Sequence, residues 1–298
     1  MGLYRTIQKT HIMKKYNFSQ FTVKSVMLAL ALTGFTKIYA QEEKHEFSMY
    51  AGGVFSSIYY DLEGGQVDHE HGVQLGLKYS YFLNDNWSIG LGGEYQTYNS
   101  NARFDFASAS YNAVDFENDS FEFRYNMTSY RENQKLHYVN IPVTVQFETG
   151  DGITDFYIAI GAKAGFAIKG EYETTIENVS TSGYYPQYNA ELFGPTFMGF
   201  GTFSGVRPGK QDLETKIAWS GTLESGVKQY VGDHNSCYIG LFLDYGFNSI
   251  ADSKEENVVN YPADEMPVNL KYNSVINSSY TKDVRLIAYG IKLRYAFF

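Results

Sequence analysis

The chain closes with residues 283–298, DVRLIAYGIKLRYAFF, and this stretch decides the fold. Large apolar residues occupy every second position from Ile287 to Phe297, and small or charged residues such as Gly290 and Lys292 lie between them. A period of two is typical of a β-strand whose two faces meet different surroundings. A strand of this kind that ends on aromatic residues indicates the closing strand of a transmembrane β-barrel.

Residues 1–40 have the composition of a targeting segment. They contain six basic residues and no acidic one, and they include an apolar run at residues 25–35. Because a helix needs about 20 apolar residues to span a bilayer, this run is too short to be a membrane anchor. It fits the apolar region of a signal peptide, and Ala40 is the small residue expected before a cleavage point. The true start of the chain is either Met1 or Met13.

The rest of the chain, residues 41–298, is long enough for a single all-β domain. Its only cysteine is Cys237, so an internal disulfide and a cysteine metal cluster are both excluded. Beyond the leader the chain carries 18 basic and 33 acidic residues. This balance excludes nucleic acid as a partner, because phosphates require a basic surface. No cofactor and no metal site are predicted.

Alternation with a period of two recurs through this domain and predicts eight strands. The predicted strands are residues 46–59, 72–83, 87–98, 138–148, 155–169, 216–231, 237–249 and 283–298. Short turns join the second strand to the third, the fourth to the fifth and the sixth to the seventh, whereas the other connections are long. This order predicts an all-β fold, an eight-stranded antiparallel up-and-down transmembrane β-barrel. Its tight turns and both termini are periplasmic, and its long loops are external.

The long connections hold most of the net charge of the domain. They are residues 60–71, 99–134, 170–215 and 251–281, and together they contain 21 acidic and 7 basic residues. The second loop alternates again at residues 103–106 and 121–125. We expect these residues to extend the third and fourth strands as a protruding hairpin, whose exposed edge would be able to bind a partner by strand addition. A barrel of ten membrane strands is the alternative.

The apolar face of the strands points either outward to lipid or inward, as in a soluble lipocalin-like barrel. Glycines such as Gly76 and Gly240 are frequent on the polar face, which suits a crowded lumen. Aromatic residues such as Trp87 lie where the apolar face meets the short turns, as in an interfacial girdle. The polar face also carries isolated charges that would be costly in lipid: Lys78, Glu94, Lys163, Glu224, Lys228, Asp244, Lys292 and Arg294. We therefore predict an outward apolar face and a charge network that plugs the lumen, with a narrow conductive path as the alternative.

Tyr138, Ile141 and Pro142 lie in the sequence YVNIPV and form the motif Tyr-x-x-Ile-Pro. This motif resembles a strand of the outer-membrane β-barrel domain of Bacteroidota, the PorT-like relatives of the OmpA-type transmembrane barrel. The strand at residues 156–166 and the sequence DYG at residues 244–246 resemble later strands of that family. The resemblance implies an outer-membrane barrel and, as one option, an accessory of protein secretion. Because proline removes a ladder hydrogen bond, we expect a bulge or a special register at Pro142.

The aromatic terminus predicts an assembly signal that the barrel-insertion machinery recognises. This signal comprises Tyr295, Phe297 and Phe298. Phe297 is in phase with the apolar face, whereas Phe298 lies one residue past it. Outer-membrane lipid is the second partner expected from this architecture.

The remaining polar residues form no recognisable catalytic arrangement. The sequence DHEH at residues 68–71 resembles a metal-binding cluster, but a solvated acidic loop tip is the simpler interpretation. His137 and His234 have no positioned serine or cysteine partner, so a hydrolytic triad is not predicted.

Together these patterns predict a non-enzymatic outer-membrane protein with an envelope-structural or surface-interaction role through its long acidic loops. Three alternatives remain open at this point: a PorT-like accessory of protein secretion, a narrow channel, and an outer-membrane hydrolase. A surface-interaction role predicts an extracellular protein as the partner. A PorT-like accessory role predicts a component of the secretion system.

Overall fold

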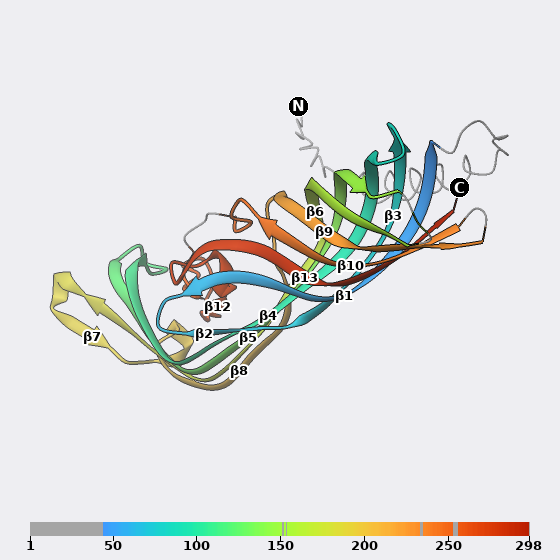
Figure 1. Ribbon diagram of the computed structural model, residues 1–298. Helices are drawn as coiled ribbons and strands as arrows, with labels where there is room; N and C mark the ends of the chain where they lie inside the picture. The colour runs from blue at the N-terminus through green and yellow to red at the C-terminus, as the bar shows by residue number, and fades with distance from the viewer. Residues whose placement is uncertain (1–43, 151, 153, 233–234, 253–255, 298) are drawn as a thin grey trace, which may run out of the picture. The chain divides into compact units, whose positions relative to one another are not determined.

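The computed structural model describes residues 44–297 except for residues 151, 153, 233–234 and 253–255. The predicted leader, His234 and Phe298 therefore lie outside the described residues. No helix in the described part of the chain is long and apolar enough to cross a membrane. The structure consists almost entirely of antiparallel strands (Figure 1).

The described residues form strands and three short 3₁₀ helices. The strands are β1 (His45–Leu62), β2 (Gln66–His69), β3 (His71–Phe82), β4 (Trp87–Val114), β5 (Ser120–Glu148), β6 (Thr154–Tyr185), β7 (Ala190–Leu192), β8 (Gly201–Asp212), β9 (Ala218–Val231), β10 (Asn235–Gly246), β11 (Val259–Asn260), β12 (Lys271–Tyr272) and β13 (Thr281–Phe297). The helices are η1 (Pro186–Tyr188), η2 (Thr196–Met198) and η3 (Val275–Asn277).

Eight of these strands close into a ring. Their order is β4-β3-β1-β13-β10-β9-β6-β5, and β5 pairs with β4 to complete the circle. The first and last strands are neighbours, with Phe47 opposite Phe297, and on its other side Phe297 lies opposite Asn235 of β10. The predicted eight-stranded antiparallel barrel is thus confirmed, and the ten-stranded alternative is wrong.

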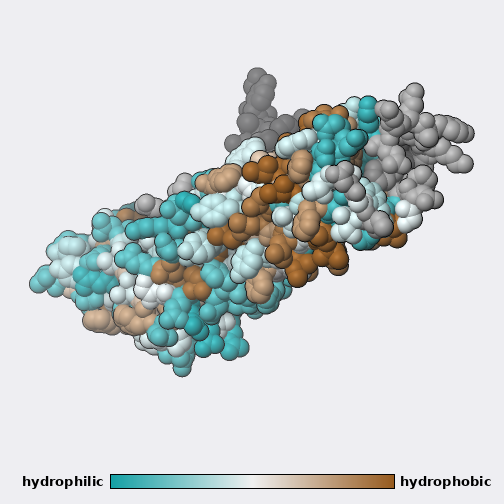
Figure 2. Space-filling view, viewed as in Figure 1, coloured by the Kyte–Doolittle hydropathy of each residue, from teal (hydrophilic) through white to brown (hydrophobic). Residues whose placement is uncertain are grey.

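The two faces of each ring strand have opposite surroundings. On β13, Ile291 and Leu293 are each 55% exposed, whereas Lys292 and Arg294 are only 5% and 3% exposed. Apolar side chains therefore point away from the ring and charged ones point into it, as predicted for a barrel in lipid and opposite to a lipocalin. Figure 2 shows the apolar side chains gathered over the ring, while the end of the molecule that carries β7 and β8 is mostly hydrophilic.

Glycines on the inner face make room for large side chains of neighbouring strands. A Cβ atom added at Gly76 would lie 2.2 Å from the ring of Tyr50, and one added at Gly240 would lie 2.2 Å from the hydroxyl of Tyr157. Contacts this short do not occur between real atoms, so both positions accept only glycine without rearrangement. Large side chains therefore cross the lumen and pack against the opposite strands, as expected for eight strands.

Pro142 does not shift the register, so the expected bulge is absent there. Before the proline, Leu91 of β4 faces Val143, and after it Glu94 faces Asn140 with the same offset. Between these two pairs, Gly92 and Gly93 of β4 have no paired residue on β5, because proline has no N–H to donate. The irregularity on the other side of β5 lies four to five residues earlier, between His137 and Tyr138.

Three neighbouring strands continue far beyond the ring. β4, β5 and β6 contain 28, 29 and 32 residues, whereas a membrane crossing needs about 9–11. The hairpin of β4 and β5 stays in register up to Val114 opposite Ser120, which confirms the predicted protruding hairpin. We call this extension, with β2, β7 and β8 on its sides, the projecting sheet (Figure 1).

The prediction that residues 170–215 form a loop is wrong. Residues 171–181 belong to β6 and pair with β8, and residues 183–185 pair with β7. Inward residues such as Tyr172 and Ile176 do alternate with polar ones, but threonine and serine dilute the pattern. These β-branched and hydroxyl residues still suit a strand that has water on one face.

A second core lies on the inner face of the projecting sheet, beyond the charged lumen. The segment between β10 and β13 folds back against this face and contributes Val258, Val259, Tyr261, Val268, Val275 and Ile276. The sheet contributes mainly aromatic and aliphatic residues, among them Phe104, Phe121, Phe123, Tyr125, Tyr130, Ile176 and Val179. Burial of this much apolar surface explains how the long strands stay ordered outside the ring.

Candidate functional site

The eight charged residues predicted to fill the lumen all lie inside the ring. They are Lys78, Glu94, Lys163, Glu224, Lys228, Asp244, Lys292 and Arg294, and none is more than 9% exposed. Each of these side chains points into the lumen, because successive side chains of a strand point to opposite faces. Several long cations lie opposite glycine, as Lys292 does opposite Gly52 and Gly240, which leaves their side chains free to cross the lumen.

The cluster nearest the projecting sheet is centred on Lys163. Its Nζ lies 2.9 Å from Oε1 of Glu94 and 2.7 Å from Oδ2 of Asp244. Asn140 and Tyr50 also donate hydrogen bonds to the carboxylate of Glu94, at 2.8 and 2.9 Å. One buried cation thus compensates two carboxylates that come from opposite sides of the ring.

A middle cluster contains one ion pair and two cations that have no acidic partner. Lys292 Nζ lies 2.9 Å from Oε2 of Glu224. Lys78 Nζ and Arg294 Nη2 both donate to Oε1 of Gln146, each at 3.0 Å. Among the described residues neither of these two cations forms an ion pair with a carboxylate.

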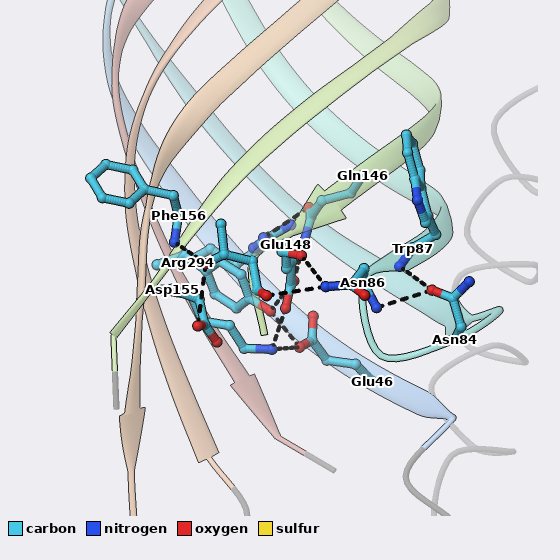
Figure 3. Close-up of polar contacts among 12 residues, drawn as sticks. Glu46, Asn84, Asn86, Trp87, Gln146, Glu148, Asp155, Phe156 and Arg294 are labelled. Atoms are coloured by element: carbon cyan, nitrogen blue, oxygen red, sulfur yellow. Dashed lines mark hydrogen bonds and ion pairs between the residues drawn. The ribbon is translucent and has the colours of Figure 1, made fainter. Parts of the chain in front are cut away.

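The third cluster lies next to the short turns and contains two acids that the sequence analysis did not single out. Lys228 Nζ lies 2.7 Å from Oε2 of Glu148 and 3.9 Å from Oε2 of Glu46. Tyr238 donates its hydroxyl towards both carboxylates, at 2.7 Å to Glu46 and 3.0 Å to Glu148. Figure 3 shows Glu46 and Glu148 close together at this end of the barrel. Both acids are in phase with the polar face, and this was the signal that could have identified them.

The described side chains of these clusters fill most of the lumen. A cavity of about 20 Å³ lies among the side chains of the cluster around Lys163 and of the middle cluster. That volume accommodates about one water molecule and is too small for a hydrated ion. The geometry therefore favours the predicted plug over the narrow conductive path.

A buried carboxylate also fixes the segment that covers the projecting sheet. Glu132 of β5 is 1% exposed and accepts hydrogen bonds from Ser274 Oγ at 2.7 Å and from the backbone N–H of Val275 at 3.1 Å. Tyr130 and Gln134, also on β5, donate to the same carboxylate at 2.5 and 2.7 Å. Burial raises the pKa of Glu132, and no ion pair between described residues involves its carboxylate to offset this effect.

Four aromatic residues in the connections of the projecting sheet are exposed. They are Phe116, Tyr188, Phe193 and Phe197, which are 52%, 66%, 71% and 54% exposed. The turn that contains Phe116 contacts the segment after β6, since Tyr185 and Tyr188 donate to Asp115 and Asp119 at 3.0 and 3.2 Å. We call these four residues the aromatic tip.

Comparison with protein-family models identifies the architecture. A model of the outer membrane protein beta-barrel domain matches residues 39–292. The chain belongs to this outer-membrane β-barrel family. Its location is therefore the outer membrane, in agreement with the ring of eight strands and its apolar outer face.

Solved outer-membrane proteins resemble this family member only distantly. Neisserial surface protein A is 11% identical, with a TM-score of 0.33, and 85% of this chain and 96% of that chain are covered. OprG from Pseudomonas aeruginosa is 11% identical, with a TM-score of 0.37 and coverages of 85% and 95%. Ail, the attachment invasion locus protein of Yersinia pestis, is 12% identical, with a TM-score of 0.33 and coverages of 85% and 99%. Comparison with curated protein sequences finds no match.

The motif of Tyr138, Ile141 and Pro142 has a structural place in this outer-membrane barrel. Tyr138 is buried near the upper rim, where its hydroxyl lies 2.8 Å from Oγ1 of Thr215. Ile141 points outward on the lipid face, and Pro142 lines the lumen cavity. Within one strand, the motif therefore places a buried hydrogen-bonding tyrosine, a lipid-facing isoleucine and a proline that packs in the lumen.

The predicted assembly signal lies on the outer face of the barrel. Tyr295 and Phe297 are both exposed there, and the ring of Phe297 stacks 6.5 Å from that of Phe47 on β1. Phe298 is outside the described residues. Recognition of these residues by the insertion machinery remains a prediction.

The histidines do not assemble a catalytic or metal site in the described part of the barrel. His69 Nδ1 lies 2.6 Å from Oγ of Ser57, and its ring stacks on Tyr59, but no carboxylate among the described residues forms an ion pair with this histidine. His137 Nδ1 lies 2.6 Å from the hydroxyl of Tyr95. No group of three or more His, Cys, Asp or Glu residues in the described ranges is arranged to hold a metal ion.

Proposed function

We propose that this outer-membrane barrel is a non-enzymatic surface-interaction protein. The barrel acts as a closed anchor, and the projecting sheet carries the binding surface away from the lipid. The observation that carries this proposal is the length of β4, β5 and β6, which are about three times longer than a membrane crossing requires. A purely structural barrel would need none of this extension.

The aromatic tip is the best candidate for the contact itself. Exposed aromatic residues are unusual away from the lipid face, and they are enriched at the centres of protein interfaces. Acidic residues surround the tip, and the nearby Arg124 is already engaged by Glu122 at 2.6 Å and Glu191 at 3.3 Å. This surface fits an extracellular protein that offers apolar pockets and a basic rim.

The aromatic tip can be tested without disturbing the fold, because its side chains are exposed. We would replace Phe116, Tyr188, Phe193 and Phe197 together by serine and measure the binding of outer-membrane vesicles to immobilised fibronectin, laminin and collagen and to whole cells. Loss of several interface anchors should weaken binding by about tenfold or more. Phe106→Ser is the matched control, because Phe106 is equally exposed but lies outside the tip. Wild-type vesicles that bind no better than vesicles lacking the protein would contradict the proposal.

The resemblance of Tyr138, Ile141 and Pro142 to PorT-like barrels of Bacteroidota supports a second candidate, an accessory of protein secretion. Such an accessory would work through its periplasmic side. The serine variant of the tip would then leave secretion unchanged, whereas replacing the short turn at residues 83–86 would reduce the amount of exported protein in the medium. The opposite pattern favours the surface-interaction role.

A further inference from the structure

Two buried cations in the lumen share one neutral acceptor. Lys78 Nζ and Arg294 Nη2 both donate to Oε1 of Gln146 at 3.0 Å. The amide is held in this orientation because its Nε2 donates to Oε1 of Glu148 at 2.5 Å. The other three buried cations of the lumen each contact a carboxylate. The Arg294 guanidinium also lies over the ring of Tyr238, with its Cζ 3.7 Å from the ring centroid, but neither cation has a carboxylate partner among the described residues. Two buried cations without an anionic partner are unfavourable, so a negative charge at this site would be stabilising.

The cavity of about 20 Å³ lies beside these two cations, and both carboxylates in its lining, Glu94 and Glu224, already contact other lysines. Lys78, Thr144 and Arg294 all line it. Oγ1 of Thr144 and Nε of Arg294 are buried and have no hydrogen-bond partner. Lys78 donates only to Gln146 among the described residues and so retains spare N–H groups. The unsatisfied groups around the cavity are therefore mainly donors.

The absence of a side chain at Gly90 lets the Lys78 side chain and the Thr144 hydroxyl approach each other. A Cβ atom added at Gly90 would lie 2.3 Å from Cε of Lys78, 2.7 Å from Oγ1 of Thr144 and 3.2 Å from Nζ of Lys78. The ammonium and the hydroxyl thus surround one point above the glycine. Any larger residue at this position would displace the Lys78 side chain, which lines the cavity.

We propose that this cavity binds one monatomic monovalent anion, which is chloride in the cell. The volume admits about one water-sized particle and excludes polyatomic anions such as sulfate or phosphate. Four cations and two carboxylates line the cavity, namely Lys78, Lys163, Lys292 and Arg294 against Glu94 and Glu224. Asp244, which does not line the cavity, also pairs with Lys163 at 2.7 Å, so a surplus of one positive charge remains (4 − 2 − 1). This surplus favours an anion over a water molecule. The anion would lock β3, β5 and β13 together and would not pass through the closed lumen.

Crystals of the mature barrel grown or soaked in sodium bromide test the site directly. Bromide replaces chloride and gives an anomalous signal. We expect a single anomalous peak in the lumen, in contact with Lys78 Nζ, Thr144 Oγ1 and Arg294 Nε. Density at this point that shows no anomalous signal, and is the same with and without bromide, identifies water and overturns the proposal.

The unfolding temperature of the barrel in detergent provides a second test. We would compare sodium chloride with sodium gluconate at equal ionic strength, because gluconate is too large for the cavity. Chloride should raise the unfolding temperature by on the order of 3 °C for each tenfold increase in concentration once the site fills. Equal unfolding temperatures in the two salts would overturn the proposal.

Three variants separate the anion site from general effects on the lumen. Lys78→Met removes one of the two cations and should abolish the difference between the salts. Thr144→Asp places a carboxylate in the cavity and should also abolish it, while the protein remains folded in both salts. Ser236→Ala is the matched control, because its hydroxyl is buried and unpartnered but does not line the cavity. If Ser236→Ala loses the chloride effect as fully as Lys78→Met, the site is not the cause.

Discussion

Replacing Lys163 by methionine tests how much the charge cluster in the lumen contributes to the free energy of unfolding. Methionine keeps the length of the side chain but removes the charge that Glu94 contacts at 2.9 Å and Asp244 contacts at 2.7 Å. Both carboxylates are only 2% exposed, so water cannot replace the lost contacts. Breaking a buried ion pair by removing one partner costs about 3–5 kcal/mol. A loss of this size is a large part of the roughly 5–15 kcal/mol that stabilises a typical domain.

Urea unfolding in lipid vesicles measures this loss. Trp87 and Trp219 both lie on the lipid face, so their fluorescence reports the departure of the strands from the membrane. Adding Glu94→Gln and Asp244→Asn to Lys163→Met should recover most of the lost free energy of unfolding, because the two carboxylates that lost their cation are then neutral.

An exposed ion pair is the matched control for this experiment. Lys271 Nζ lies 3.0 Å from Oε1 of Glu265, with more than half of the lysine side chain exposed. Lys271→Met should leave the free energy of unfolding unchanged, since solvent screens such a pair. If Lys163→Met and Lys271→Met change the free energy of unfolding equally, the reasoning about the buried cluster is refuted.

Three further predictions follow from the packing of the lumen and of the projecting sheet. Gly240→Val should lower the free energy of unfolding by about 1–3 kcal/mol through overpacking, whereas Gly93→Ala, with open space around it, should not; urea titration of both variants measures this. Burial raises the pKa of Glu132 above its ordinary value of 4.5, so its contribution to stability is complete below that value and is lost as the pH rises through the raised pKa. The free energy of unfolding of the wild type, measured relative to Glu132→Gln, should therefore fall as the pH rises above the ordinary value of 4.5, and a rise would contradict the assignment. Planar bilayers that contain the wild-type barrel should show no discrete conductance. Discrete conductance that changes on charge reversal at Lys163 or Glu94 would instead support the narrow channel.

The sequence was sufficient to predict most of the ring. Alternation places Ile291 and Lys292 on opposite faces whatever the partners of the strand are, so the positions of the strands and the contents of the lumen follow from local pattern. The same argument failed for residues 171–185, because both faces of that part of β6 carry polar side chains and the pattern is diluted. It also missed Glu46 and Glu148, which lie at strand ends where alternation has the fewest neighbours to support it.

The height of each side chain in the lumen was decided by tertiary structure. A period of two gives the face of a residue but not the stagger between strands, and that stagger is fixed only when the ring closes through the pairing of β13 with β1. Closure brings Lys163 between Glu94 and Asp244, although 69 and 81 residues separate them in sequence. The sequence by itself thus determined where this protein lies and which of its faces meets lipid, because these depend on local alternation. The pairing of the charges inside, and the two cations that share Gln146, depend on contacts across the barrel that exist only in the folded ring.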